Sequence, residues 1–116
     1  FKSFLTSCPP DDTQARDMDF LLAAGELFTL IAYGQLILEN ASLQGVEDPL
    51  IDQIFDFMVR DFSRHALGLY STTSATPEQA AHCLKMIHRP AKDAGRFEFV
   101  WRNLVMASVD AYTMTP

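Results

Sequence analysis

The sequence has few of the residues from which metal sites, disulfide scaffolds and phosphate-binding loops are built. Its 116 residues include two cysteines, three histidines and five glycines. Cys8 and Cys83 are too few and too widely spaced for a disulfide framework or a zinc motif. The glycines are scattered and form no phosphate-binding loop. These absences argue against a metal centre, a disulfide-stabilised fold and a nucleotide-binding motif.

Positive charge is also scarce. Nine Lys and Arg residues stand against fifteen Asp and Glu residues, for a formal net charge of −6. Recognition of nucleic acid normally requires a basic face, so this balance argues against a nucleic-acid partner. Residues 1–63 carry eleven acidic and three basic side chains, whereas residues 64–116 carry four acidic and six basic ones. We therefore expect the two parts of the chain to attract each other.

Long hydrophobic runs are absent as well. The longest apolar stretch, within residues 27–40, is interrupted by Gly34 and Gln35 and is shorter than the roughly 18 to 20 residues that span a bilayer. No basic segment followed by an apolar one opens the chain, so we expect no signal peptide. Two unpatterned cysteines fit a reducing compartment. These features predict a cytoplasmic protein with no transmembrane segment.

Helical periodicity and helix-terminal signals are abundant. Pro9 and Pro10 predict an extended N-terminal segment over residues 1–12. After it, apolar residues recur at spacings of three and four, and helix boundaries are marked by N-cap residues, a capping box at Thr76 and a stop at Pro90. No stretch alternates with a period of two. The sequence predicts four helices, at about residues 13–42, 48–69, 76–89 and 93–111.

This pattern predicts an all-α fold, an up-down bundle of about four helices in a single domain over residues 13–116. The first helix is the longest and is apolar on nearly every side, so we expect it to be central. The predicted buried core comprises Phe28, Ile31, Leu38, Ile54, Met58, Phe62, Leu84, Val100, Trp101 and Leu104.

No group of residues with catalytic spacing is visible. His65, His82 and His88 share no helical face with a second ligand, and a surface or half-buried position accounts for them. Cys83 has only His82 and Lys85 as polar neighbours, and a buried free thiol is the simpler interpretation. The carboxylates follow helix-surface patterns, without the apolar isolation that prepares one for acid–base chemistry. We therefore assign no catalytic, cofactor-binding or metal-ligating residue.

One polar stripe is a candidate interface. Glu26, Thr29, Tyr33 and Asn40 follow one another at steps of three, four and seven along the first predicted helix, so they share a line beside its apolar face. Such a line is typical of a contact surface for another domain, or for a cofactor held at an interface. The alternative interpretation is the solvent-exposed side of an amphipathic helix.

Several segments of the chain carry a family resemblance. They are residues 26–40 (ELFTLIAYGQLILEN), 52–56 (DQIFD), 59–63 (VRDFS) and 111–116 (AYTMTP), together with Arg89-Pro90, Phe97 and Val100-Trp101. These segments resemble the carboxy-terminal helical region of large bacterial acyl-CoA dehydrogenases, from about residue 20 onward. The similar positions are spread over helix surfaces and cores and form no compact catalytic motif.

The resemblance implies a parent flavoprotein of fatty acid metabolism, an FAD-dependent oxidoreductase that acts on acyl thioesters. In that family FAD lies between helical and β-rich domains. The β-rich domain is missing here, and no residue matches a family base or flavin contact, so we expect no cofactor in this chain. We expect a non-catalytic C-terminal helical domain that packs on the remainder of the parent enzyme or forms a homo-oligomer. The alternative is a stand-alone helical module that binds a protein or an acyl ligand.

Overall fold

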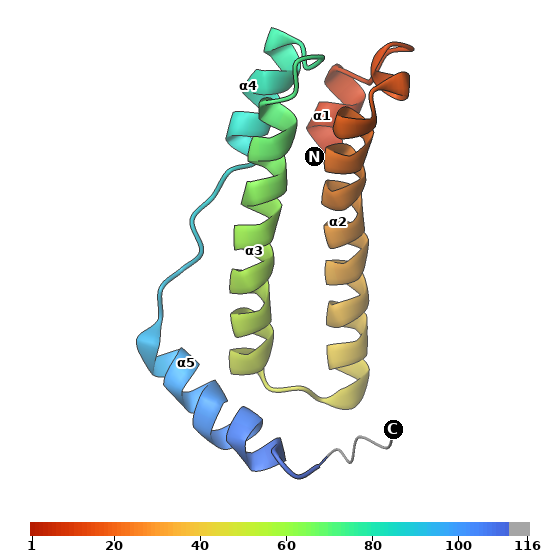
Figure 1. Cartoon of the computed structure of the whole chain (residues 1–116). Coiled ribbons are helices and arrows are strands. Elements are labelled where there is room, and N and C mark those ends of the chain that lie inside the picture. The colour runs from red at the N-terminus through yellow and green to blue at the C-terminus, as the bar shows by residue number, and fades with distance from the viewer. Residues whose placement is uncertain (112–116) are drawn as a thin grey trace.

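The computed structural model of this chain describes residues 1–111, within which all regular elements are helical. Two long antiparallel helices, α2 and α3, form a hairpin, and short helices pack at its two ends (Figure 1). The α-helices are α1 (Lys2–Ser7), α2 (Met18–Gln44), α3 (Asp48–Tyr70), α4 (Pro77–Lys85) and α5 (Ala94–Val100). A 3-10 turn (Gln14–Arg16) precedes α2, and a π-helical segment (Trp101–Val105) and a 3-10 turn (Met106–Ser108) follow α5. The predicted all-α class with one long helix is confirmed.

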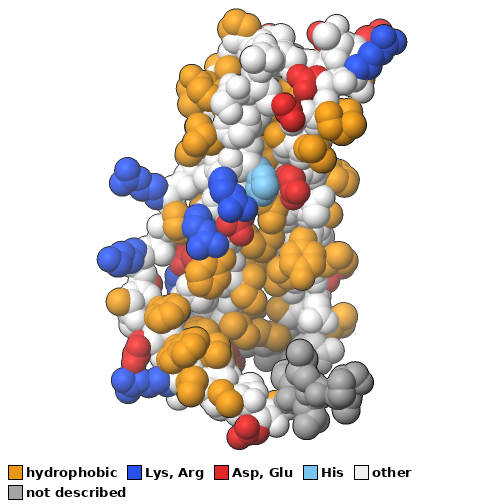
Figure 2. All heavy atoms as spheres, in the orientation of Figure 1, with side chains coloured by type: hydrophobic (Ala, Val, Ile, Leu, Met, Phe, Trp, Pro, Cys, Tyr) orange, Lys and Arg blue, Asp and Glu red, His pale blue; other side chains and the backbone are white. Residues whose placement is uncertain are grey.

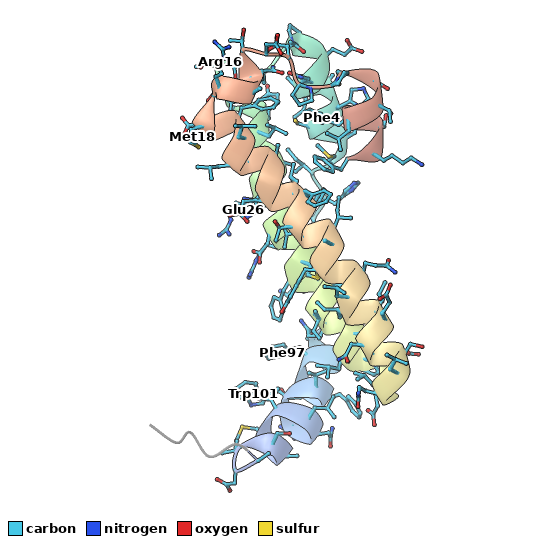
Figure 3. All side chains as sticks on the ribbon, turned by 90° about the vertical axis from the view of Figure 1, so that its right-hand side faces the viewer. Phe4, Arg16, Met18, Glu26, Phe97 and Trp101 are labelled. Carbon is cyan, nitrogen blue, oxygen red and sulfur yellow. The ribbon has the colours of Figure 1, made fainter. Side chains whose placement is uncertain are left out.

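The short helices do not complete a four-helix bundle. α1 and α4 lie together at the end of the hairpin away from its turn, and α5 packs on α3 nearer the turn. Figure 3 shows α1 and α4 on one face of the hairpin and α5 on the other. At 1.5 Å per residue, α4 and α5 extend about 14 and 11 Å, whereas α2 extends about 40 Å. The predicted up-down bundle is therefore not confirmed, because the short helices cannot cover the long ones.

One apolar seam holds the hairpin together. Phe20, Leu27, Gly34 and Ala41 are buried on α2 at seven-residue intervals, the repeat of helices that pack side by side. Gly34 allows the backbone of α2 to approach α3 closely, since a Cβ at this position would lie 3.3 Å from Met58 Cε. The first helix of the hairpin is thus buried along a single edge.

Most of the predicted helix-terminal signals are present in the structure, with one shift. The Asp17 carboxylate accepts two backbone N–H groups in the first turn of α2, so this helix begins at residue 18 rather than 13. The Ser74 hydroxyl donates to the same carboxylate, and this bond, followed by that from the Phe20 N–H, lowers the pKa of Asp17. Gly45 ends α2 in the left-handed conformation, with φ 64°. The capping box at Thr76 is confirmed.

The predicted extended segment over residues 1–12 is wrong for its first part, which forms α1. Phe4 on this helix is 1% exposed, and the ring of Phe1 stacks on it with a centroid distance of 5.9 Å. Pro9 and Pro10 restrict only the residues next to them. The apolar residues ahead of the two prolines therefore form a helix and gain burial against α4.

A buried glutamine pair ties the N-terminal segment to α4. Gln14 and Gln79 are 1% and 2% exposed. The Gln14 amide donates to Gln79 Oε1 (2.7 Å) and to the Ser74 carbonyl (2.7 Å). The Gln79 amide donates to Gln14 Oε1 (3.0 Å) and to the Cys8 carbonyl (3.1 Å). The amide nitrogen and oxygen of both side chains therefore have hydrogen-bond partners. The pair joins three segments of the chain, and no buried polar atom of the two side chains is left unsatisfied.

The predicted core is confirmed only in part. Val100 is buried, and Ile54, Met58, Phe62 and Leu104 are partly buried. The prediction is wrong for five residues whose side chains are exposed: Phe28 (63%), Ile31 (46%), Leu38 (46%), Leu84 (54%) and Trp101 (46%). On α2 the reason is that the seam uses one edge of a broad apolar face, and no third long helix within residues 1–111 covers the remainder.

The result is an elongated molecule with a large surface. Its Cα radius of gyration is 17.7 Å, against about 13 Å for a compact domain of this length. Its accessible surface is 8425 Å², whereas a compact monomer of 13.0 kDa exposes about 6,300 Å². The excess is about 2,000 Å². Many apolar side chains of α2 are exposed: Leu21, Leu22, Phe28, Ile31, Tyr33, Leu36, Leu38 and Leu43.

The position of the seam predicts which leucines of α2 stabilise the hairpin. Leu27→Ala removes a fully buried side chain and should lower the free energy of unfolding by about 2 to 5 kcal/mol. Leu22→Ala, at a site that is 59% exposed, should change it by less than about 0.5 kcal/mol. Urea unfolding followed by circular dichroism measures both. Equal losses for the two variants would place the seam on a different edge of α2.

Candidate functional site

The main candidate site is an apolar groove between α2 and α3, with a volume of about 500 Å³. It opens on the face of the hairpin that also carries α1 and α4, the side of Phe4 in Figure 3. We call it the α2–α3 groove. Its walls are formed by Leu30, Ile31, Gly34, Gln35 and Leu38 of α2 and by Phe55, Met58, Val59 and Phe62 of α3.

The local sequence explains why a groove forms here. Gly34 has no side chain, so Phe55 and Met58 approach the α2 backbone and leave a depression beside it. Ile31 and Leu38 stand on the rim and are each 46% exposed. Such a surface provides apolar contact area to whatever covers it, with few groups that could orient a small polar molecule.

The two ends of the groove carry opposite charges. Lys85 and His88 line the end next to α4. His88 is held there because its backbone N–H donates to Ser63 Oγ (2.9 Å), and the Ser63 hydroxyl donates to the His88 carbonyl (2.7 Å). Toward the hairpin turn, the groove reaches Leu38, which shares a small surface hollow with Glu39. The groove is therefore basic at the end near α4, and Glu39 lies just beyond its other end, near the turn.

The predicted interface stripe lies on the other flank of α2. Glu26, Thr29, Tyr33 and Asn40 are all exposed, and Tyr33 is 60% exposed. At 3.6 residues per turn they form one line on the side away from the groove. Figure 3 places Glu26 on the same side of the hairpin as Phe97 of α5. The four residues are brought together as expected, but none lines the groove, and their role as an interface stays a prediction.

A second hollow, of about 470 Å³, lies between α3, the segment before α5 and α5 itself. Arg60 lies over the ring of Phe57 in its wall, 5.3 Å from the ring centroid.

Nearby, Arg96 of α5 forms an ion pair with Asp56 of α3, and both side chains are only 17% exposed. This pair joins the acidic and the basic part of the chain. Figure 2, which views the face that carries α5, shows apolar side chains gathered over α5 and between the two long helices on that face.

The polar groups offer little for catalysis. Among residues 1–111, no three His, Cys, Asp or Glu side chains converge on a metal position. Cys8 and Cys83 are free and lie in the same buried apolar cluster. Burial, and secondly the proximity of Cys8, raises the pKa of the Cys83 thiol to about 11. The thiol is therefore protonated at neutral pH and is a poor nucleophile.

One property of α2 bears on membranes. Within the described residues, α2 is the helix that is long and apolar enough to cross a bilayer. Only 11% of its most apolar 18-residue window is buried. The same test is passed by core helices of soluble proteins. The expectation of no transmembrane segment, drawn from Gly34 and Gln35, therefore stays a prediction.

Comparisons with known proteins add no family to this picture. A scan against protein-family models finds no match, and neither does a search of curated proteins or of solved structures. The resemblance to acyl-CoA dehydrogenases rests on the quoted residues alone. Its last segment, residues 112–116, lies outside the described residues.

Several polar residues that matter in the structure were not found from the sequence. The one signal for the buried role of Gln79 is its place in the sequence, since it is followed by two alanines in the first turns of a helix. Asp56 belongs to the carboxylates that follow a helix-surface pattern, yet it is partly buried and pairs with Arg96. Lys85 and His88 reach the groove only because the chain after α4 is tied to α3 by Ser63. That tertiary contact leaves no local sequence signal.

The raised pKa of Cys83 predicts a pH dependence of stability. The unfolded thiol ionises near its ordinary pKa of 9.0, whereas the folded thiol ionises near 11. Between these values the unfolded state has lost more protons, so the free energy of unfolding should fall as pH rises, by roughly 1 to 3 kcal/mol. Below pH 9 the Cys83 thiol is protonated in both states, so it should add no pH dependence to the free energy of unfolding. Urea unfolding from neutral pH upward should show this fall in the free energy of unfolding for wild type and not for Cys83→Ala. Parallel plots of the free energy of unfolding against pH for the two proteins would contradict the prediction.

Proposed function

We propose that this chain is a non-catalytic helical assembly domain, which buries the α2–α3 groove against another protein surface. The observation that carries the proposal is the exposure of apolar side chains on the rim of the groove, since Ile31 and Leu38 of α2 are each 46% exposed. A helix that is apolar on all sides is normally covered by protein or by lipid. Monomeric soluble proteins rarely expose a contiguous apolar patch larger than a few hundred Å² to solvent.

The composition of the groove supports a protein partner. Phe55, Met58 and Phe62 provide aromatic and thioether groups in its wall, and such groups are enriched in the centres of protein interfaces. Charged side chains lie only at the two ends, at Lys85 and Glu39. An apolar centre with a polar rim is the usual arrangement of a protein–protein contact.

The family resemblance suggests the protein that would use such a domain. In this proposal the parent is an acyl-CoA dehydrogenase-like, FAD-dependent oxidoreductase, and this chain is its C-terminal helical domain. It would pack on the remainder of the enzyme or on its own copies. The proposal assigns neither a flavin contact nor a catalytic base to this chain, in agreement with the protonated state of Cys83 and the scattered histidines.

An acyl-ligand-binding module is the second candidate. The volume of the groove, about 500 Å³, lies within the usual range of ligand sites, and Lys85 at one end could pair with a carboxylate or phosphate. Assembly is favoured because a ligand site normally encloses most of its ligand, whereas the rim residues Ile31 and Leu38 face open solvent.

Ligand titration separates the two candidates. An assembly domain should show no saturable rise in melting temperature with fatty acids or acyl-CoAs, because the open groove cannot enclose an acyl chain. The purified chain should also carry no flavin absorbance. The measurements are a thermal-shift titration and a visible spectrum, with Phe62→Ser as the control that removes a groove wall. A saturable stabilisation that disappears in Phe62→Ser would establish the ligand module instead.

A further inference from the structure

We propose that the α2–α3 groove is filled by the same groove of a second copy of this chain, so that two hairpins form a two-fold symmetric four-helix bundle. The inference rests on the proposed assembly function and names its partner. Three independent features support it: a second heptad seam on α2, the distribution of charge along the groove, and the amount of uncovered surface.

The first feature is a second repeat on α2, of which Ala24 packs against the buried core cluster while the following members are left half-exposed. Ala24, Ile31 and Leu38 recur every seven residues, directly beside the buried seam of Phe20, Leu27, Gly34 and Ala41. Ile31 and Leu38 lie on the rim of the groove and are half-exposed. A helix with two adjacent seven-residue repeats is suited to contact two neighbouring helices at once, as helices within a bundle do. α3 supplies one neighbour, and no helix within residues 1–111 supplies the second along Ile31 and Leu38.

The shape of the chain sets the direction of the partner. α1 and α4 occupy the groove face at one end, so from Ile31 to Gln44 this face of α2 is free over about 20 Å. A parallel second copy would bring the two pairs of short helices into collision. An antiparallel copy overlaps along the free part of each hairpin, with its own α1 and α4 beyond the turn of the other. The contact is then isologous, as two-fold symmetry requires.

The charges favour the same direction. Lys85 and His88 line the groove next to α4, whereas Glu39 lies at its other end and Glu47 lies in the exposed loop of the hairpin turn. The antiparallel arrangement places the basic end of one copy over the acidic end of the other, twice. A parallel arrangement would place like charges together. Complementary rim charges of this kind mainly fix orientation and register.

The uncovered area is sufficient for a stable dimer. The chain exposes about 2,000 Å² more than a compact monomer of its mass. If each copy buried about half of this excess, the pair would bury about 2,000 Å² in total, more than the roughly 1,600 Å² of a standard protein interface. The remaining excess includes the flank of Glu26 and Tyr33, which is left for other contacts.

Matched substitutions on α2 test the contact. Sedimentation over a range of about 1 to 100 µM should show wild type at twice the 13.0 kDa chain mass. Leu38→Asp, in the groove, should weaken the dimer by more than about 100-fold. Leu36→Asp should not, because Leu36 lies on the opposite flank of the same helix and is also exposed. Both sites are open in the single chain, so circular dichroism should show both variants folded.

A charge exchange tests the partner and its direction. Lys85→Glu and Glu39→Lys should each weaken the dimer by about 3- to 10-fold, and the double variant should recover most of the loss, because the two residues meet across the two-fold axis. If the double variant dimerised no more tightly than the single variant with the lower affinity, the antiparallel pairing would be overturned. Equal effects of Leu36→Asp and Leu38→Asp would overturn the use of the groove.

Three further outcomes overturn the second-copy inference. A wild-type chain that is monomeric up to about 100 µM and is unaffected by acyl ligands overturns the second-copy inference while leaving the assembly function standing. Flotation of wild type, but not of Leu38→Asp, with phosphatidylcholine–phosphatidylglycerol vesicles overturns the inference in favour of a lipid surface. Saturable stabilisation by an acyl ligand overturns the assembly function itself.

Discussion

The structure depends on the single seam along which α2 packs against α3. Because this seam follows one edge of α2, with Gly34 at its closest point, two long helices form one layer instead of a closed bundle. A layer of two helices has two faces, and the short helices cover only part of each. The exposed apolar surface, the groove and the elongated shape all follow from this geometry. Burial of apolar area is the main driving force of folding, so the same surface that the seam leaves open is available to stabilise an assembly.

Buried polar contacts keep the short helices at the ends of the hairpin. The Gln14–Gln79 pair fastens α1 and the 3-10 turn to α4, and the pair of Arg96 with Asp56 fastens α5 to α3. Such contacts are costly when a partner is lost, because a buried polar group or charge is then left unsatisfied. They therefore act against any rearrangement in which α4 or α5 slides over the middle of α2. The groove persists because its possible covers within the described chain are tied down elsewhere.

Local signals in the sequence predicted the helical class, the long first helix and the capping box at Thr76, since each depends on neighbouring residues only. Pro9 and Pro10 do not predict the helix over residues 2–7, because a proline restricts only the residues next to it and carries no information about a segment further upstream. The core prediction failed for Ile31 and Leu38 because periodicity identifies an apolar face and cannot say which edge of a broad face finds a partner. The charged ends of the groove depend on a contact between Ser63 and His88, which are 25 residues apart, and were out of reach for the same reason.

The central claim is that the α2–α3 groove is covered in the working state of the protein, while the flank with Tyr33 is not part of the same contact. Hydroxyl-radical footprinting of the protein at high and at low concentration tests it most directly, since it reports the solvent access of individual side chains. The account predicts that Phe55, Met58 and Phe62 are protected at high concentration and become labelled on dilution, with the labelling of Tyr33 unchanged. Equal labelling of the groove residues at both concentrations, or protection of Tyr33 alone, would contradict it.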